Sequence, residues 1–246
     1  MSIAENLATI AENVPKVYEA GKQAENKAFW DIITLNNTRP HYGHTFRYWD
    51  VPYVRPPYKI TPTARGGTLY MFANNPNLLK VEKEYFDLSQ LPNQSQTNGS
   101  FGNQCIFTNC PNLVEIEDIG ITAAMYDTTY YGCSKLERIE IIRVQEDTTF
   151  YNAFSSCRAL KHLTVEGVIG TNFSIAYSPL TKESMKSIIT HLKDYSGTSN
   201  EYKYTVTFNP SAFSVLEAEG ATAEYNGVPC TWAELIDNLK WNLVKA

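Results

Sequence analysis

The side chains with the widest chemical range in this chain are its five cysteines. Thiolates bind zinc and form disulfides, and Cys110, Cys133 and Cys157 recur at intervals of 23 and 24 residues. No two cysteines have the Cys-x-x-Cys spacing of a zinc site, and their number is odd. We expect these three, termed the cysteine ladder, to be free thiols packed as small apolar side chains; a chance oxidation pair and a metal site are the alternatives. Cys105 and Cys230 lie outside this interval and are interpreted as incidental.

No other spacing indicates catalytic residues. The chain lacks Gly-x-Ser-x-Gly, a Walker phosphate loop, paired metal motifs and a glycine-rich dinucleotide turn. Its four histidines are scattered, and His41 and His44 have no third or fourth ligand nearby. We expect no enzyme activity, no cofactor and no metal. An active site built from scattered residues is the third alternative, after the two binding functions given below.

The composition argues against two kinds of partner. The 246 residues are 43% hydrophobic, enough for a substantial core, and carry a formal charge of -5. No nucleic-acid partner is expected, because such binding depends on clustered Lys and Arg. No apolar run reaches the about 18 residues that a membrane span needs, and Met1–Glu5 lacks the basic and apolar blocks of a signal peptide. We therefore predict no membrane span and synthesis in a cytoplasm.

The cysteine ladder belongs to a repeated phrase, aromatic-x-x-Cys-x-x-Leu-x-x-Ile. Its copies cover 107–116, 130–139 and 154–163, and an earlier copy over 72–81 has Asn75 at the cysteine position. The copies start 35, 23 and 24 residues apart. A period in the low twenties with a Leu-x-x-Ile core is typical of a leucine-rich repeat solenoid, in which each copy packs only on its neighbours.

Each copy predicts one short strand. Leu136–Ile141 and Leu160–Val165 alternate apolar and polar residues near their ends, as a half-buried strand does. Stacking such strands places leucine on leucine, with the aromatic residues on the opposite side of the core. We predict an α/β fold: a short leucine-rich repeat solenoid with parallel strands over 68–178, an amino-terminal helix and an α+β carboxy-terminal cap.

The phrase resembles that of the BspA-like leucine-rich repeat family, which occurs in bacterial surface proteins and phage-encoded proteins. The resemblance spans about residues 68–178 and implies a scaffold whose partners vary. Ile10–Gln23, with Phe29–Asp31 after it, resembles the opening segment of repeat proteins encoded in tail-gene regions of phages and prophages of gut Firmicutes, and Ser187–Gly197 is similar to their closing segment. This second resemblance implies a phage or virion context.

Residues 1–38 are predicted to form a helix that attaches or oligomerises the protein. Apolar residues at alternating gaps of four and three form a heptad seam, which requires a partner helix. The seam contains Ile3, Leu7, Ile10, Val14 and Val17. Pro15 either kinks this helix or starts it afresh. The alternative is an amphipathic helix that folds back as an intramolecular cap.

Three further segments complete the predicted organisation. Residues 39–67 form an aromatic and proline-rich cap, with a sugar-binding aromatic platform as the alternative. The polar stretch 93–100 is an exposed loop, either a contact site or a simple surface excursion. Residues 179–246 form the carboxy-terminal cap, with helices over 180–192, 211–218 and 232–243 and a strand over 202–208.

The outward positions of the strands form a candidate binding surface, termed the strand face. One position carries, in successive copies, Lys80, Glu115, Arg138 and His162. The position two residues later carries Glu82, Glu117, Glu140 and Thr164. Opposite charges on neighbouring strands support each other, whereas three stacked carboxylates repel. Solvent, a Lys or Arg from a neighbour, or a bound cation would relieve this repulsion.

These expectations favour a phage virion or tail-associated structural and interaction protein. The repeat domain would contact virion proteins or a host-surface protein or glycan, and the protein would be a homo-oligomer in the virion after assembly in the host cytoplasm. The alternative is a bacterial adhesin-like leucine-rich repeat module, which would have to be exported.

Overall fold

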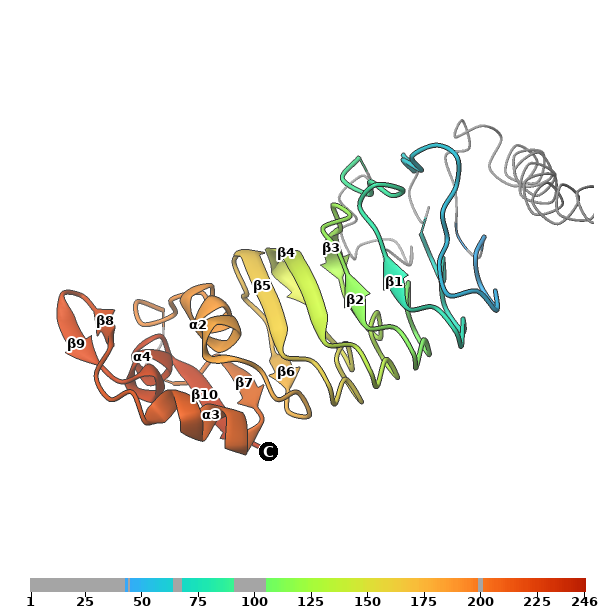
Figure 1. Ribbon diagram of the computed structural model, residues 1–246. Coiled ribbons are helices and arrows are strands. Elements are labelled where there is room, and N and C mark those ends of the chain that lie inside the picture. Colours follow the sequence, from blue (N-terminus) through green and yellow to red (C-terminus); the bar gives the residue numbers. More distant parts are fainter. Residues whose placement is uncertain (1–42, 44, 64–67, 91–104, 199–200) are drawn as a thin grey trace, which may run out of the picture.

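Figure 1 shows the computed structural model of the chain, which describes residues 43, 45–63, 68–90, 105–198 and 201–246. The fold is mixed α/β with parallel-strand sheets and few helices, and no sheet within these ranges closes into a barrel. The strands and helices follow one another along an elongated body (Figure 1). Equivalent parts of the repeated phrase can therefore be compared layer by layer.

The largest sheet is built from the repeated phrase. Its strands are β1 (Lys80–Val81), β2 (Glu115–Ile116), β3 (Thr122–Met125), β4 (Arg138–Thr149) and β5 (His162–Gly167). All pairs are parallel, and β4 is bordered by β2, β3 and β5. The register joins Val81 to Ile116, Ile116 to Ile139 and Ile139 to Leu163. Equivalent positions of the four copies therefore lie side by side.

The core behind this sheet contains two parallel rows of side chains. The leucine of each copy is 0% exposed, namely Leu78, Leu113, Leu136 and Leu160. The aromatic rings of successive copies stack with centroid separations of 5.4, 5.9 and 5.3 Å along Phe72, Phe107, Tyr130 and Phe154. Full burial of one such side chain stabilises a fold by about 1.5–3 kcal/mol, so both rows contribute to holding the copies together.

The cysteine ladder ties each layer to the preceding one. The thiols of Cys110, Cys133 and Cys157 donate to carbonyl oxygens of the preceding copy, at 3.2, 3.0 and 3.2 Å. The residue before each cysteine has a left-handed backbone, including Gly132 with φ 77°. A Cβ at Gly132 would lie 2.7 Å from Asn109 Oδ1, so glycine meets both the conformational and the steric requirement there.

The predicted aromatic and proline-rich cap of residues 39–67, termed the connector, takes part in the same core through residues 46–48. The Phe46 ring stacks on Phe72 at 5.4 Å, and its backbone N–H donates to Met71 O at 2.9 Å. Tyr48 N donates to Ala73 O at 3.1 Å, just as Asn74 N donates to Thr108 O in the next copy of the phrase. Residues 46–48 therefore add one layer before residue 68, where the repeats were expected to begin.

The carboxy-terminal part combines helices with two small sheets. The helices are α2 (Lys182–Thr190), α3 (Pro210–Glu217) and α4 (Trp232–Asn238). One sheet orders β10 (Trp241–Lys245), β7 (Tyr204–Phe208) and β6 (Phe173–Ile175) in parallel, and the other is the antiparallel pair β8 (Ala223–Tyr225) and β9 (Val228–Cys230). Helix α2 lies on β5, where Leu163 N and Val165 N donate to serine hydroxyls of α2 at 2.9 Å. The last strand of the large sheet is thus not left as a bare edge.

Two predicted helix starts are confirmed, and the predicted end of one helix is wrong. The Thr181 hydroxyl caps α2, and Thr231 with Glu234 forms a capping box on α4. The last helix was predicted to reach residue 243, but it ends at Asn238. Lys240 has a left-handed φ of 62°, and Trp241, 1% exposed, begins β10. Pairing with β7 and burial of Trp241 outweigh the helical spacing of the sequence.

Candidate binding surface

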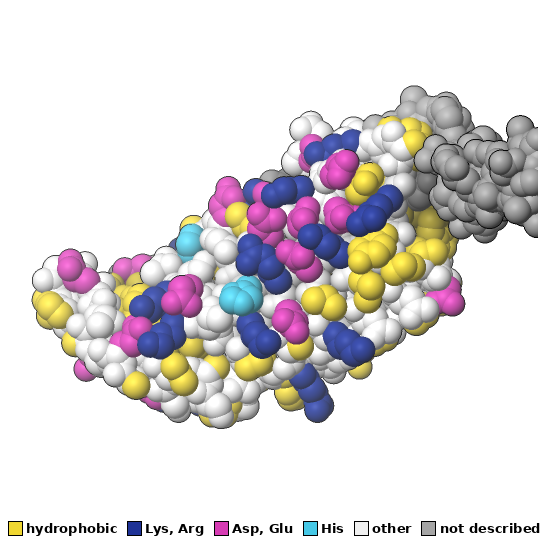
Figure 2. Space-filling view, in the orientation of Figure 1, with side chains coloured by type: hydrophobic (Ala, Val, Ile, Leu, Met, Phe, Trp, Pro, Cys, Tyr) yellow, Lys and Arg dark blue, Asp and Glu magenta, His cyan; other side chains and the backbone are white. Residues whose placement is uncertain are grey.

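Charged side chains gather on the face of the large sheet shown in Figure 2. The register places Lys80 beside Glu115, Glu115 beside Arg138 and Arg138 beside His162. Tyr53 of the connector pairs with Lys80 and extends this row by an aromatic residue. The first row of the strand face is therefore continuous over five layers.

Lys80 is the centre of an ion-pair cluster. Its Nζ lies 2.6 Å from Glu117 and 3.0 Å from Glu115. Hydrogen bonds to Glu117 and then to Glu115 raise the pKa of Lys80, and the bond from Lys80 is the main cause that lowers the pKa of Glu117. The ammonium group thus stays charged and fixed between two strands. Because these side chains remain partly exposed, each pair contributes only about 0.2–1 kcal/mol.

The carboxylate row Glu82, Glu117 and Glu140 is relieved by neighbouring cations and backbone donors. Arg55 of the connector binds Glu82 through two hydrogen bonds of 2.7 and 2.9 Å. Glu140 accepts from Asp118 N at 3.0 Å and lies 3.4 Å from Lys83 Nζ, while Lys83 N donates to Glu117 at 3.0 Å. The sequence left solvent, a neighbouring Lys or Arg, or a bound cation as ways to relieve the repulsion of these carboxylates. In the structure, Lys and Arg side chains of neighbouring segments lie against them.

Arg143 and Asp118 form a second fixed cluster that the sequence did not indicate. Two guanidinium hydrogen bonds reach Asp118, at 2.6 and 2.8 Å, and Arg143 Nε lies 3.1 Å from Glu166. The hydrogen bond from Arg143 lowers the pKa of Asp118 and raises the pKa of Arg143. Arg143 lies beyond Ile141, where the strand was expected to end, and its partner belongs to the preceding copy. Sequence spacing carried no signal for this pair.

The β5 end of the strand face is more open. Arg138 lies 3.5 Å from Glu115, while His162 and Thr164 are both exposed. The register of β4 and β5 shifts between Ile139 and Ile142, which leaves one extra residue in β4. This bulge removes Thr164 from strict alignment with Glu140. The second predicted row is thus regular over its three glutamates and displaced at Thr164.

Apolar side chains lie at one end of the charged rows and along one side of them. Tyr53, Leu79 and Val114, termed the apolar strip, are 40%, 37% and 38% exposed. They lie on successive layers, because Leu79 N donates to Pro52 O and Val114 N donates to Leu79 O. Arg55 lies over the Tyr53 ring at 4.2 Å and joins the strip to the carboxylate row. The combined surface has an apolar side and a nearly balanced set of charges.

The ladder thiols are buried, which lowers their reactivity. Burial raises the pKa of Cys110 and of Cys157 to about 12, and it raises the pKa of Cys133 well above its usual value. All five cysteines are free. Within the described ranges no three His, Cys, Asp or Glu side chains are grouped so that they could hold a metal ion. No described helix is long and apolar enough to cross a membrane.

Several predicted functional segments lie outside the described residues. They are the attachment seam of Ile3, Leu7, Ile10, Val14 and Val17 and the loop 93–100; His41 and His44, for which no metal was expected, also lie outside. Their roles therefore remain predictions. The eight strand-face residues, by contrast, lie in β1, β2, β4 and β5 or directly after one of these strands.

Comparison of the chain with protein-family models, with curated proteins and with solved structures gives no match.

Proposed function

We propose that the chain is a leucine-rich repeat scaffold of the BspA-like type that belongs to a phage virion or tail and binds proteins through its strand face. The observation that carries this proposal is the in-register row from Tyr53 through Lys80, Glu115 and Arg138 to His162. Matching positions of successive copies face one side and build one extended surface. The equivalent leucine, aromatic and cysteine positions support the repeat assignment, because each is occupied in neighbouring layers by the same kind of side chain.

The chemistry of the surface fits a protein partner best. Lys80, Lys83, Arg55, Arg138 and Arg143 each lie within 4 Å of a carboxylate, so their positive charge is largely compensated. A polyanion would have to displace these carboxylates. An apolar side with Tyr53, next to mixed charges, matches the composition of protein interfaces, in which charge complementarity selects the partner.

Pre-organisation favours binding at this surface. The ion pairs around Lys80 and Arg143 hold long side chains that would otherwise lose conformational freedom in a complex. Each immobilised long side chain costs about 0.5–1.5 kcal/mol on association. A surface whose charges are already positioned therefore keeps more of its contact energy as affinity. We propose binding rather than catalysis on this basis.

A charge reversal at Arg138 tests the binding surface. Arg138→Glu places a carboxylate beside Glu115, and Arg158→Glu is the control because Arg158 is an exposed arginine in a turn of the next copy. Both variants are immobilised and exposed to the individually purified tail proteins of the phage. The proposal predicts at least tenfold weaker binding for Arg138→Glu, with Arg158→Glu unchanged. Equal binding by both variants contradicts the assignment of the strand face.

The proposed attachment helix has a separate test. Deletion of residues 1–35 leaves the described layers intact and abolishes self-association in sedimentation, if the seam binds a partner helix. A truncated protein that unfolds, together with a monomeric full-length chain at tens of micromolar, identifies the helix as an intramolecular cap instead.

A further inference from the structure

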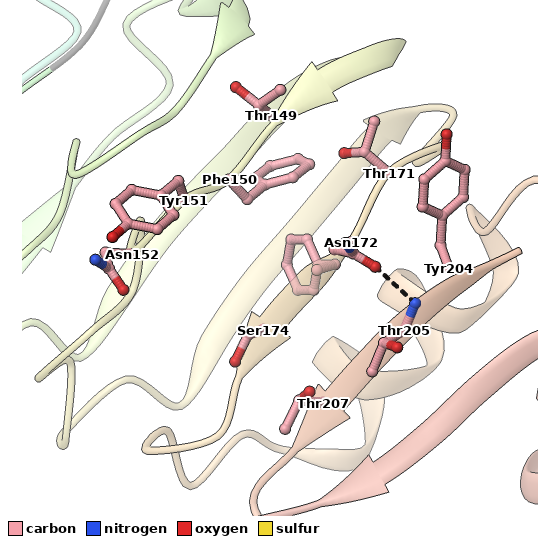
Figure 3. A pocket seen from close by; sticks show the side chains of 11 residues that line it. Thr149, Phe150, Tyr151, Asn152, Thr171, Asn172, Ser174, Tyr204, Thr205 and Thr207 are labelled. Atoms are coloured by element: carbon pink, nitrogen blue, oxygen red, sulfur yellow. Dashed lines mark hydrogen bonds between the residues drawn. The ribbon is translucent and has the colours of Figure 1, made fainter.

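A groove lies where the end of β4 faces β6 and β7. It is lined by residues 149–152, 171–174 and 204–207, except the buried Val206, and has a volume of about 500 Å³ (Figure 3). A neighbouring hollow of about 520 Å³ shares Thr149, Thr171 and Tyr204 with it and continues to Glu146 and Asp147. The two hollows form one elongated groove. None of its lining residues belongs to the strand face.

The groove is rich in neutral hydrogen-bonding groups. Ser174 and Thr207 pair in register on β6 and β7, and their hydroxyls make no hydrogen bond with the rest of the described chain. Asn172 accepts a hydrogen bond from Thr205 N at 2.8 Å through Oδ1, which leaves its amide group to donate (Figure 3). The walls thus offer donors and acceptors at fixed positions. Lys and Arg are absent from the lining.

The groove also presents an aromatic face and a rigid base. Tyr151 is 72% exposed at one edge. Its turn is held by Asp127, whose Oδ1 accepts from Tyr151 N and from the Thr149 hydroxyl, both at 2.8 Å. Beneath it, the buried rings of Phe150 and Phe173 meet edge to face at 4.8 Å. The binding groups therefore stand on packed core residues, so little reorganisation is needed to receive a ligand.

We propose that this groove binds a neutral oligosaccharide. Sugar rings expose C–H faces that pack on aromatic rings and hydroxyls that need neutral donors and acceptors, and the groove supplies both. A phosphate or sulfate group would require the Lys or Arg that the lining lacks. Glu146, at one end of the groove, forms an ion pair with Lys193, so the positive charge of this lysine is already compensated. The two hollows share three lining residues, so a chain of several linked sugars can span both, whereas a single ring cannot.

This inference goes beyond the proposed protein contacts of the strand face and is tested apart from them. Full-length protein is applied to an array of defined neutral and anionic oligosaccharides, and the best neutral tetrasaccharide on the array is then titrated in solution. Two groove variants are compared, Thr207→Val and Tyr151→Ala. Tyr48→Ala is the control, because Tyr48 is 66% exposed and belongs to the layer of Phe46 at the other end of the described body.

Thr207→Val removes one hydroxyl at nearly constant size and is expected to weaken binding roughly two- to tenfold. Tyr151→Ala removes the aromatic face and is expected to weaken it at least tenfold, with Tyr48→Ala unchanged. Circular dichroism and the unfolding midpoint of each variant establish that it folds. Three results overturn the proposal: no binding to any neutral oligosaccharide, binding restricted to anionic ones, or equal affinities for folded groove variants and the control. None of these results bears on binding at the strand face.

Discussion

Replacement of Leu136 by alanine measures how strongly the stacked copies hold together. Leu136 is 0% exposed and lies in the same core row as Leu113 and Leu160, each also 0% exposed. Removal of the side chain loses the equivalent of three buried carbon groups, about 2.4 kcal/mol at roughly 0.8 kcal/mol each. The cavity adds to this loss, because neighbouring layers on both sides limit its collapse. We expect a total of about 2.5–5 kcal/mol.

The assay is urea unfolding followed by circular dichroism under reducing conditions. With a typical slope of about 1–3 kcal/mol per molar urea, the midpoint falls by about 1 M or more. Leu79→Ala is the matched control, because Leu79 is 37% exposed in the apolar strip and its loss is expected to change stability by less than about 0.5 kcal/mol. A Leu136→Ala loss below about 1 kcal/mol, or equal losses for the two variants, would refute the stacked-layer reasoning.

Three further predictions follow from the same contacts. The cysteine ladder is expected to resist a thiol reagent at pH 8 until denaturant is added, and fast reaction of all three thiols in native protein would contradict their burial. Arg143 holds the pKa of Asp118 below its ordinary 3.8, so the pair's contribution to stability is complete above that pH and is lost as the pH falls through the lower folded-state pKa. Asp118→Asn should therefore flatten the loss of stability between about pH 5 and 2, and an unchanged acid profile would argue against the pair. Gly167→Ala introduces a Cβ at φ 102°, 2.0 Å from Val144 O, and is expected to lower the unfolding free energy by more than about 1–3 kcal/mol in thermal or urea unfolding.

The strand face could be anticipated because spacing alone determines it. The interval between Lys80, Glu115, Arg138 and His162 follows from the phrase, and parallel pairing in register brings these four together. The bulge in β4 could not be predicted from the sequence, because it results from the way two adjacent strands fit together. It displaces Thr164 from the row.

Spacing along the sequence could not predict the contacts between distant segments. The residues just before Leu243 have helical spacing but belong to strand β10. They do so because β10 pairs with β7, whose residues lie far earlier in the chain. The groove between β4, β6 and β7 likewise brings together three segments that share no motif. The β8–β9 hairpin, however, had a signal: Asn226-Gly227 supplies the two left-handed residues of a tight turn, with φ of 52° and 79°.

The proposed function is tested most directly by locating this chain after phage production. Virions are purified by density gradient from cells that carry and express the gene, and the chain is quantified by mass spectrometry and labelled with antibodies in electron micrographs. The proposal predicts several copies per particle, with the label at the tail. Recovery of the chain from the bacterial cell surface, with purified particles free of it, would contradict the virion assignment.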